Sequence, residues 1–104
     1  MPMATIGTRE VHTDAEGFLT DYDEWDEDLA RVLAAAIGID LTEAHWPAIR
    51  FLRADFAQQG QTATLRRVST LAHIPIKELF ALFPGKPAKK MAYIAGLPKP
   101  QGCV

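Results

Sequence analysis

The chain has little cysteine and no long apolar run. Cys103 is the single cysteine among 104 residues, so no disulfide can form within the chain and a reducing compartment is expected. No apolar run approaches the roughly 20 residues that a membrane-spanning helix needs. The first residues also lack the basic start and apolar stretch of a secretory signal. We therefore expect a cytoplasmic protein that does not associate with membranes.

The common cofactor-binding and catalytic motifs are missing as well. The sequence has no glycine-rich phosphate loop, dinucleotide fingerprint, zinc-ligand spacing or Ser/His/Asp pattern. The acidic run at 21–28 is dense, but acids there suit the positive end of a helix dipole better than a metal site. His45 has no second histidine or nucleophile at a recognisable spacing, which favours a packed histidine over a catalytic base. We expect neither a cofactor nor a metal ion.

The first part of the chain has few basic residues, and the second part has almost no acidic ones. Residues 1–60 hold twelve of the thirteen acids and four arginines, a net charge of −8. Residues 61–104 hold seven lysines and arginines against Glu78 alone, a net charge of +6. The total of −2 at pH 7 hides this asymmetry. It predicts a basic face formed by the second part, with an ordinary solvated surface as the alternative.

What is present predicts one small, mainly α domain with a modest core. Helix start and stop signals predict a compact bundle of about five helices, beginning after the acidic run and near Thr42, Thr64, Pro75 and Pro87. Turn formers in the segment 10–19 predict a small N-terminal β-hairpin.

Apolar residues at helical spacing predict the inward faces. On three of the helices these positions are Leu29, Val32, Leu33 and Ala36; Leu65, Val68 and Leu71; and Ile76, Leu79, Phe80 and Phe83. The main core is expected from Trp25, Trp46, Ile49, Phe56, Leu79 and Phe80.

The segment 65–83 is similar to a helix-turn-helix, because two predicted helices flank a short break. The second helix offers only Lys77 to base edges, with Glu78 beside it, and the sequence pI near 5.8 provides no strongly basic footprint. A packing unit is therefore favoured, and direct nucleic-acid binding is not expected. A DNA-binding or regulatory module that uses this segment is the alternative.

The end of the chain is typical of neither a helix nor an interior strand. Pro98 and Pro100 fix φ and remove two N–H donors. We expect a flexible, extended C-terminal arm over residues 97–104, attached to a single helical domain over residues 1–96. A thiol near the tip of such an arm suits a carrier of sulfur, whereas an inert terminal cysteine is the simpler alternative.

Cys103 is the only credible nucleophile of the chain. A free cysteine has a pKa of about 8.5, so little thiolate is present at neutral pH without help. Lys99 and the basic second part favour the thiolate, and Gly102 allows the backbone to approach a partner closely. Together with Lys89 and Lys90 on the fifth predicted helix, they are the expected binding residues.

Over most of its length the chain resembles the DsrC/TusE family of sulfur-relay proteins. The most specific match is the tail 94–100, which closes in Gly102-Cys103-Val104. The other matching segments are Gly17-Phe18-Leu19, Trp25, Gly38-Ile39-Asp40-Leu41-Thr42, His45-Trp46, Phe51-Leu52-Arg53, Leu82-Phe83-Pro84 and Pro87-Ala88-Lys89.

The resemblance implies a cytoplasmic carrier rather than a free-standing enzyme. Its penultimate cysteine, here Cys103, would accept sulfane sulfur as a persulfide and pass it on. The implied partners are a donor protein of the TusBCD or DsrEFH type and a downstream acceptor enzyme, in tRNA 2-thiouridine formation or sulfur oxidation. A non-catalytic subunit of a sulfite-reductase-type enzyme is the other implied role.

Some positions depart from the family pattern. Two-cysteine members carry a second arm thiol eleven residues before the penultimate one, where this chain has Ala92, so it resembles the single-cysteine, TusE-like members. The stretch between Arg67 and Leu82 is shorter than in either subgroup. The identity of the donor and the acceptor therefore stays open.

Overall fold

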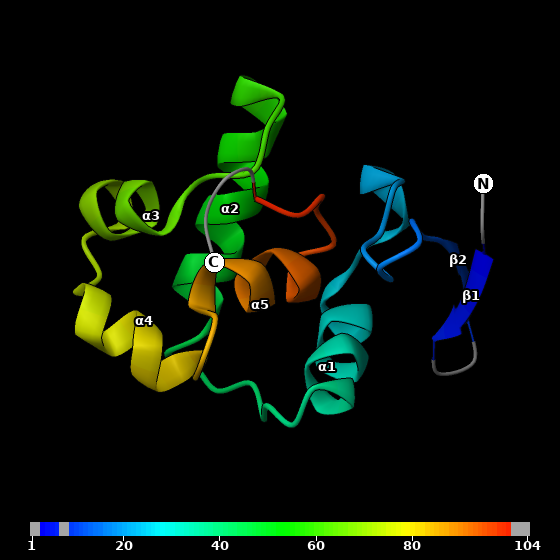
Figure 1. Cartoon of the computed structure of the whole chain (residues 1–104), viewed down its shortest axis with the longest axis horizontal. Helices are drawn as coiled ribbons and strands as arrows, with labels where there is room; N and C mark the ends of the chain where they lie inside the picture. The colour runs from blue at the N-terminus through cyan, green and yellow to red at the C-terminus, as the bar shows by residue number, and fades with distance from the viewer. Residues whose placement is uncertain (1–2, 7–8, 101–104) are drawn as a thin grey trace.

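The computed structural model describes residues 3–6 and 9–100 of the chain. Within these residues a two-stranded sheet precedes five α-helices (Figure 1). The elements are β1 (Met3–Ile6), β2 (Arg9–His12), the 3₁₀ turn η1 (Tyr22–Glu24), α1 (Glu27–Ala36), α2 (Trp46–Gln59), α3 (Leu65–Ala72), α4 (Ile76–Leu82) and α5 (Pro87–Ile94). The prediction of a mainly α bundle of about five helices is confirmed. No helix in the described ranges has the length and apolar character needed to cross a membrane.

Helix α5 forms the centre of the fold. It contacts α1, α2 and α4, and Figure 1 shows it between the α3–α4 pair at one end and the sheet at the other. Full burial of a large apolar side chain stabilises the folded state by about 1.5–3 kcal/mol. The largest side chains with almost no exposure include Leu33, Ile49, Leu52, Leu79, Phe83, Met91, Ile94 and Leu97.

The predicted hairpin is correct in its turn and wrong in its strand pairing. Asp14 Oδ1 accepts hydrogen bonds from the backbone N–H groups of Glu16 (2.9 Å) and Phe18 (3.0 Å), so residues 14–17 do form a turn. The segment after that turn joins the one before it by a single bridge, Thr13–Leu19. The ladder partner of β2 is instead β1, in antiparallel pairing.

Side-chain caps explain where several helices begin. Asp26 Oδ1 accepts from the Leu29 N–H at 2.8 Å at the start of α1, and Thr64 Oγ1 accepts from the Arg67 N–H at 3.2 Å at the start of α3. The acidic run therefore starts helices, as expected. Thr42 does not cap α2 as predicted, because its carbonyl accepts from the His45 N–H at 3.0 Å in a separate turn.

Three predicted inward faces are partly wrong. On α1 the buried residues are Leu29, Ala30, Leu33 and Ala34, while Val32 is 39% exposed. On α3 and α4, Leu71, Ile76 and Phe80 are 47%, 41% and 46% exposed. These two short helices each bury one residue fully, Val68 and Leu79, because they touch the rest of the molecule along a single edge. Of the expected core, Trp46, Ile49 and Leu79 are buried, and Trp25 and Phe56 pack against it partly exposed.

Candidate functional site

The sequence-predicted site residues fall into two groups. Cys103 and Gly102 lie outside the described residues. Lys89 and Lys90 lie on α5 and line an open groove, and Lys99 reaches the rim of that groove through Glu16, with 3.3 Å between Nζ and Oε1. The structure therefore brings the three described lysines to one side of the molecule.

Residues 94–98, which we call the arm base, lead toward the cysteine and are held by side chains from distant parts of the chain. Trp25 Nε1 donates to the Ile94 carbonyl at 2.8 Å, and Arg53 Nη1 donates to the Ala95 carbonyl at 2.9 Å. Thr62 Oγ1 donates to the Pro98 carbonyl at 2.7 Å. The chain thus stays in contact with the helical body as far as Pro98.

Leu97 adds an apolar anchor to these bonds. Its side chain has no measurable exposure, and its N–H donates to the Ala92 carbonyl at 3.0 Å. Ala92 itself is fully buried in α5. Position 92, where the resemblance in the sequence would put a second thiol, thus holds a small, packed side chain whose carbonyl binds the arm base.

Arg53 is the centre of the anchoring cluster. Its guanidinium carbon lies 3.9 Å from the Tyr22 ring centroid and 4.2 Å from that of Trp25, and Nη2 donates to the Tyr22 carbonyl at 2.9 Å. Burial lowers the pKa of Arg53, an effect opposed by Tyr22 and Asp23. Sequence reasoning missed Arg53 as a functional residue, and its one signal was the match of Phe51-Leu52-Arg53 to the family.

Gly96 is required where the arm base passes Trp25. Its φ is +69°, and a Cβ placed on it would lie 2.6 Å from Trp25 Cδ1. In the sequence, Gly96 is only one residue of the tail segment 94–100 that matches the family. Its role, which depends on a residue far away in the sequence, is to let the backbone approach the indole ring.

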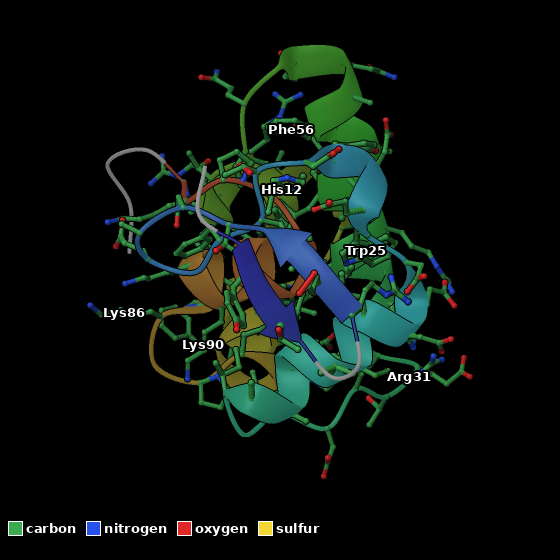
Figure 2. The ribbon with its side chains drawn as sticks, turned by 90° about the vertical axis from the view of Figure 1, so that its right-hand side faces the viewer. His12, Trp25, Arg31, Phe56, Lys86 and Lys90 are labelled. Carbon is green, nitrogen blue, oxygen red and sulfur yellow. The ribbon has the colours of Figure 1, made fainter. Side chains whose placement is uncertain are left out.

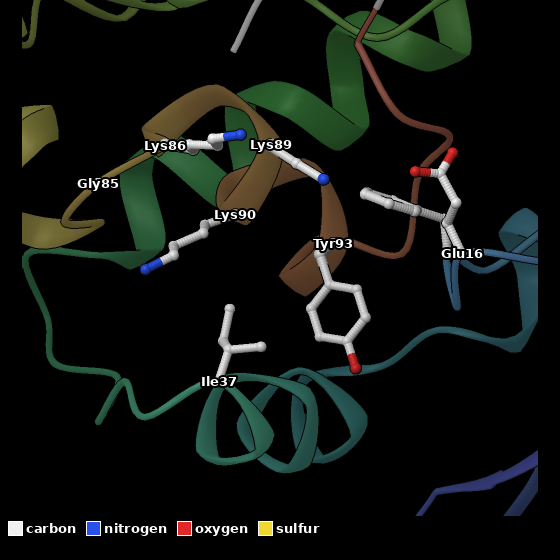
Figure 3. Close-up of a pocket in the computed structure, with 8 residues that line it drawn as sticks. Glu16, Ile37, Gly85, Lys86, Lys89, Lys90 and Tyr93 are labelled. Atoms are coloured by element: carbon white, nitrogen blue, oxygen red, sulfur yellow. The ribbon is translucent and has the colours of Figure 1, made fainter.

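The groove that Lys89 and Lys90 line is a candidate binding feature. It has a volume of about 470 Å³ and lies between the start of α5, the turn at 14–18 and the end of α1 (Figure 3). The rings of Phe18 and Tyr93 meet edge to face in its wall, with centroids 5.8 Å apart. The complete lining is Glu16, Phe18, Ile37, Gly85, Lys86, Lys89, Lys90 and Tyr93.

The groove lysines lie apart from most acids of the first part of the chain, with Glu16 as the exception. At the start of α1 these acids pair with arginines: Asp26 with Arg9 at 2.9 Å and Glu27 with Arg50 at 3.1 Å. Figure 2 shows Lys86 and Lys90 on one side of the molecule and Arg31 on the other. The predicted basic face therefore corresponds to the start of α5.

His45 is the packed histidine that the sequence favoured. It is 6% exposed, and its Nδ1 accepts from the Thr42 N–H at 3.0 Å. Its Nε2 lies 3.0 Å from the Leu82 carbonyl, which can only accept, so Nε2 carries the proton. Both ring nitrogens are engaged, and the histidine joins the start of α2 to the end of α4.

A second polar cluster brings ligand-type atoms together. His12, Asp21 and Glu24 place one such atom each within 4.8 Å of the others. Glu24, however, accepts from the backbone N–H and from Nδ1 of His12, each at 2.8 Å, and these bonds lower its pKa. Because that His12 nitrogen donates to the carboxylate, the cluster is explained as a link between β2 and η1.

The α3–α4 pair gives no support to DNA reading. Arg67 on α3 forms a bidentate pair with the buried Asp55, at 3.0 Å and 2.7 Å, which raises the Arg67 pKa and occupies its guanidinium. Arg66 and Lys77 are exposed, but Leu71, Ile76 and Phe80 on the same pair are apolar, so the pair offers few hydrogen-bonding groups to base edges.

Comparison with known proteins identifies the family. The family model described as DsrC like protein matches residues 5–104. The chain is 43% identical over 102 residues to the protein named Sulfurtransferase TusE of Sodalis glossinidius, covering 91% of this chain and 94% of that protein. It is 42% identical over 103 residues to the protein of the same name from Yersinia pseudotuberculosis, covering 92% and 95%.

Solved structures agree. DsrC of Allochromatium vinosum superposes with a TM-score of 0.82 at 32% identity, covering 98% of this chain and 97% of that one. The oxidized gamma subunit of dissimilatory sulfite reductase (DsrC) from Archaeoglobus fulgidus gives a TM-score of 0.80 at 37% identity, covering 99% and 100%. The chain belongs to the DsrC-like family, which confirms the resemblance seen in the sequence.

Proposed function

We propose that this protein is a single-cysteine sulfur carrier in a cytoplasmic sulfur relay. The observation that carries the proposal is that the family match extends to residue 104 and so includes Cys103, the only thiol of the chain. Relatives that align over nine-tenths of the chain or more are named Sulfurtransferase TusE. A carrier needs one accessible thiol and no metal or cofactor of its own.

The chemistry is thiol–persulfide exchange at Cys103. The Cys103 thiolate attacks the outer sulfur of a donor persulfide, a new S–S bond forms, and the donor leaves as its thiolate. The proton on the transferred sulfur stays with it, which gives Cys–S–SH without net oxidation or reduction. An acceptor thiolate then removes the outer sulfur in the same way.

The anchored arm base gives this chemistry a defined origin. With Pro98 held by Thr62, the five residues from Lys99 to Cys103 span at most about 16 Å, at about 3.3 Å per residue. Gly102 would let the backbone next to the thiol enter a narrow site, and Lys99 adds positive charge directly after the arm base, on the side of the molecule that Lys89 and Lys90 also occupy. That charge favours the thiolate and acidic partner surfaces.

The partners follow from the family. We propose a sulfur donor of the TusBCD or DsrEFH type and a downstream acceptor, in tRNA 2-thiouridine formation or in sulfur oxidation. A second candidate role, as a non-catalytic subunit of a sulfite-reductase-type enzyme, is favoured by the similarity to the Archaeoglobus protein, which is the gamma subunit of such an enzyme. Co-purification with such an enzyme would support the subunit role, whereas sulfur loading of the isolated chain supports the carrier.

Intact-mass measurement after incubation with a persulfide donor tests the proposal. The wild-type protein should gain the mass of one sulfur atom, and a reductant should remove it. Cys103→Ser should gain nothing under the same conditions. A wild-type protein that stays unmodified, or a Cys103→Ser variant that loads equally, would contradict the carrier function.

A further inference from the structure

The groove beside α5 has the size of a small-molecule site. Its volume of about 470 Å³ lies within the range of roughly 300–1,000 Å³ that is typical of ligand pockets. Phe18, Ile37 and Tyr93 provide its apolar wall (Figure 3). The groove therefore fits a small molecule with an apolar part.

The charges around the groove favour an anion. Lys86 is exposed and Lys89 half-buried, and neither makes a hydrogen bond or ion pair with another residue in the ranges 3–6 and 9–100. Lys90 donates to the Pro84 carbonyl at 2.6 Å and keeps two further N–H groups. Glu16 is the one acid in the lining, and Lys99 pairs with it. Two free ammonium groups suit a ligand with two carboxylates.

Tyr93 adds a neutral donor to this lining. Burial raises the pKa of its hydroxyl, so the group stays protonated at neutral pH and adds no negative charge to the groove. Lys90 and Tyr93 both project from α5, and Ile37 faces them from the end of α1 (Figure 3). A ligand with charged ends and a short apolar stem would match both the lysines and the apolar wall.

The groove also lies within reach of the thiol. Lys99 is tied to Glu16 on the groove rim at 3.3 Å, and Cys103 follows four residues later. Four residues span at most about 13 Å, at about 3.3 Å each. The groove therefore lies on the side of the molecule where Lys99 leads on to Cys103.

We propose that the groove binds a low-molecular-weight persulfide whose carbon skeleton carries carboxylates, and that this molecule donates sulfur directly to Cys103. The proposal rests on the sulfur-carrier function proposed above. Lys86 and Lys89 hold the carboxylates, and the apolar wall holds the stem. The Cys103 thiolate bonds to the outer sulfur, the S–S bond of the donor breaks, and the donor leaves as its thiolate with no net redox change.

Loading kinetics of the full chain test the proposal. The probes are glutathione persulfide, which has two carboxylates, and the persulfide of 2-mercaptoethanol, which has none. The double variant Lys86→Ser/Lys89→Ser should lower the loading rate with dilute glutathione persulfide about tenfold, the effect of losing two partly exposed ion pairs. Its rate with the neutral persulfide should not change.

Arg66→Ser/Lys77→Ser is the matched control, because it removes the same charge from exposed positions on α3 and α4. It should load like the wild type with both probes. A second measurement needs no reaction: S-methylglutathione added to Cys103→Ser should shift the amide resonances of Lys89 and Tyr93, and should not do so once both lysines are replaced.

The outcomes separate this proposal from the carrier function. Equal loading of the wild type and the lysine variant by glutathione persulfide would overturn the groove proposal and leave the carrier function intact. So would a wild-type loading rate that rises linearly with persulfide concentration without saturating, together with no resonance shifts. Failure of both persulfides to load Cys103 would overturn the carrier itself. If the lysine variant slowed transfer only from a donor protein, the groove would serve protein docking, and the proposal would be wrong.

Discussion

The arm base, residues 94–98, and the α3–α4 pair differ in an instructive way. The pair is regular helix and leaves Leu71, Ile76 and Phe80 largely exposed. The arm base is mostly irregular, yet it buries Leu97 and has three carbonyls bound by side chains from elsewhere. Helices satisfy their own backbone groups, whereas irregular buried backbone needs partners from outside. The segment with the less regular structure is therefore the one held in place more firmly.

Among the variants that test this comparison, Gly96→Ala should lower the free energy of unfolding most. The new methyl group would lie 2.6 Å from Trp25 Cδ1 at a φ of +69°, so backbone strain and overpacking should together cost about 3 kcal/mol. Thermal unfolding should show a melting temperature lower by roughly 12–20 °C. Gly60→Ala is the control, because φ there is +73° and a Cβ would meet nothing within 4 Å. Equal losses in the two variants would show that Trp25 does not restrict the arm base.

Arg53→Met should have the next largest effect. The substitution keeps an unbranched side chain but leaves the Ala95 and Tyr22 carbonyls without their donor, at a cost of about 2 kcal/mol in the free energy of unfolding. Arg50→Met, on the same helix, loses only a surface pair with Glu27 and should cost less than about 1 kcal/mol. Urea denaturation compares the two. A smaller loss for Arg53→Met than for Arg50→Met would contradict the anchoring role.

Phe80→Ser should have little effect although it removes a large apolar side chain. Phe80 is 46% exposed on α4, so the substitution should change the free energy of unfolding by no more than about 0.5 kcal/mol. Its buried neighbour provides the contrast, since Leu79→Ala should cost about 2–5 kcal/mol. A large loss for Phe80→Ser in urea denaturation would mean that the α3–α4 pair is packed more tightly than its exposure indicates.

Deleting residues 101–104 should have the smallest effect on stability. All contacts of the arm base stay in place, so the melting temperature should change by no more than about 2 °C, the shift expected from a few tenths of a kcal/mol. Sulfur loading should disappear with Cys103. A large drop in the melting temperature would show that the last residues support the body.

The sequence predicted what depends on local patterns. The acidic run and Thr64 marked helix starts, and the segregation of charge predicted a basic face, to which the lysines at the start of α5 correspond. The anchoring of the arm base was not predictable in this way, because Arg53 and Trp25 reach carbonyls 42 and 69 residues away.

The spacing of apolar residues also leaves tertiary contacts unpredicted. It marks Leu71 and Phe80 as apolar at helical spacing, but it cannot say how much of a short helix another element covers. The groove depends on tertiary structure in the same way, because its lining comes from the turn at 14–18, the end of α1 and the start of α5.

Onward transfer of sulfur tests the central claim most directly. The protein is loaded with persulfide, freed of the donor and mixed with an excess of glutathione, and its mass is followed with that of the small thiol. We predict that the protein loses the one sulfur atom it gained and that glutathione persulfide appears in equal amount. Sulfur that stays on the protein, or that loads at a residue other than Cys103, would contradict a carrier that works through its penultimate cysteine.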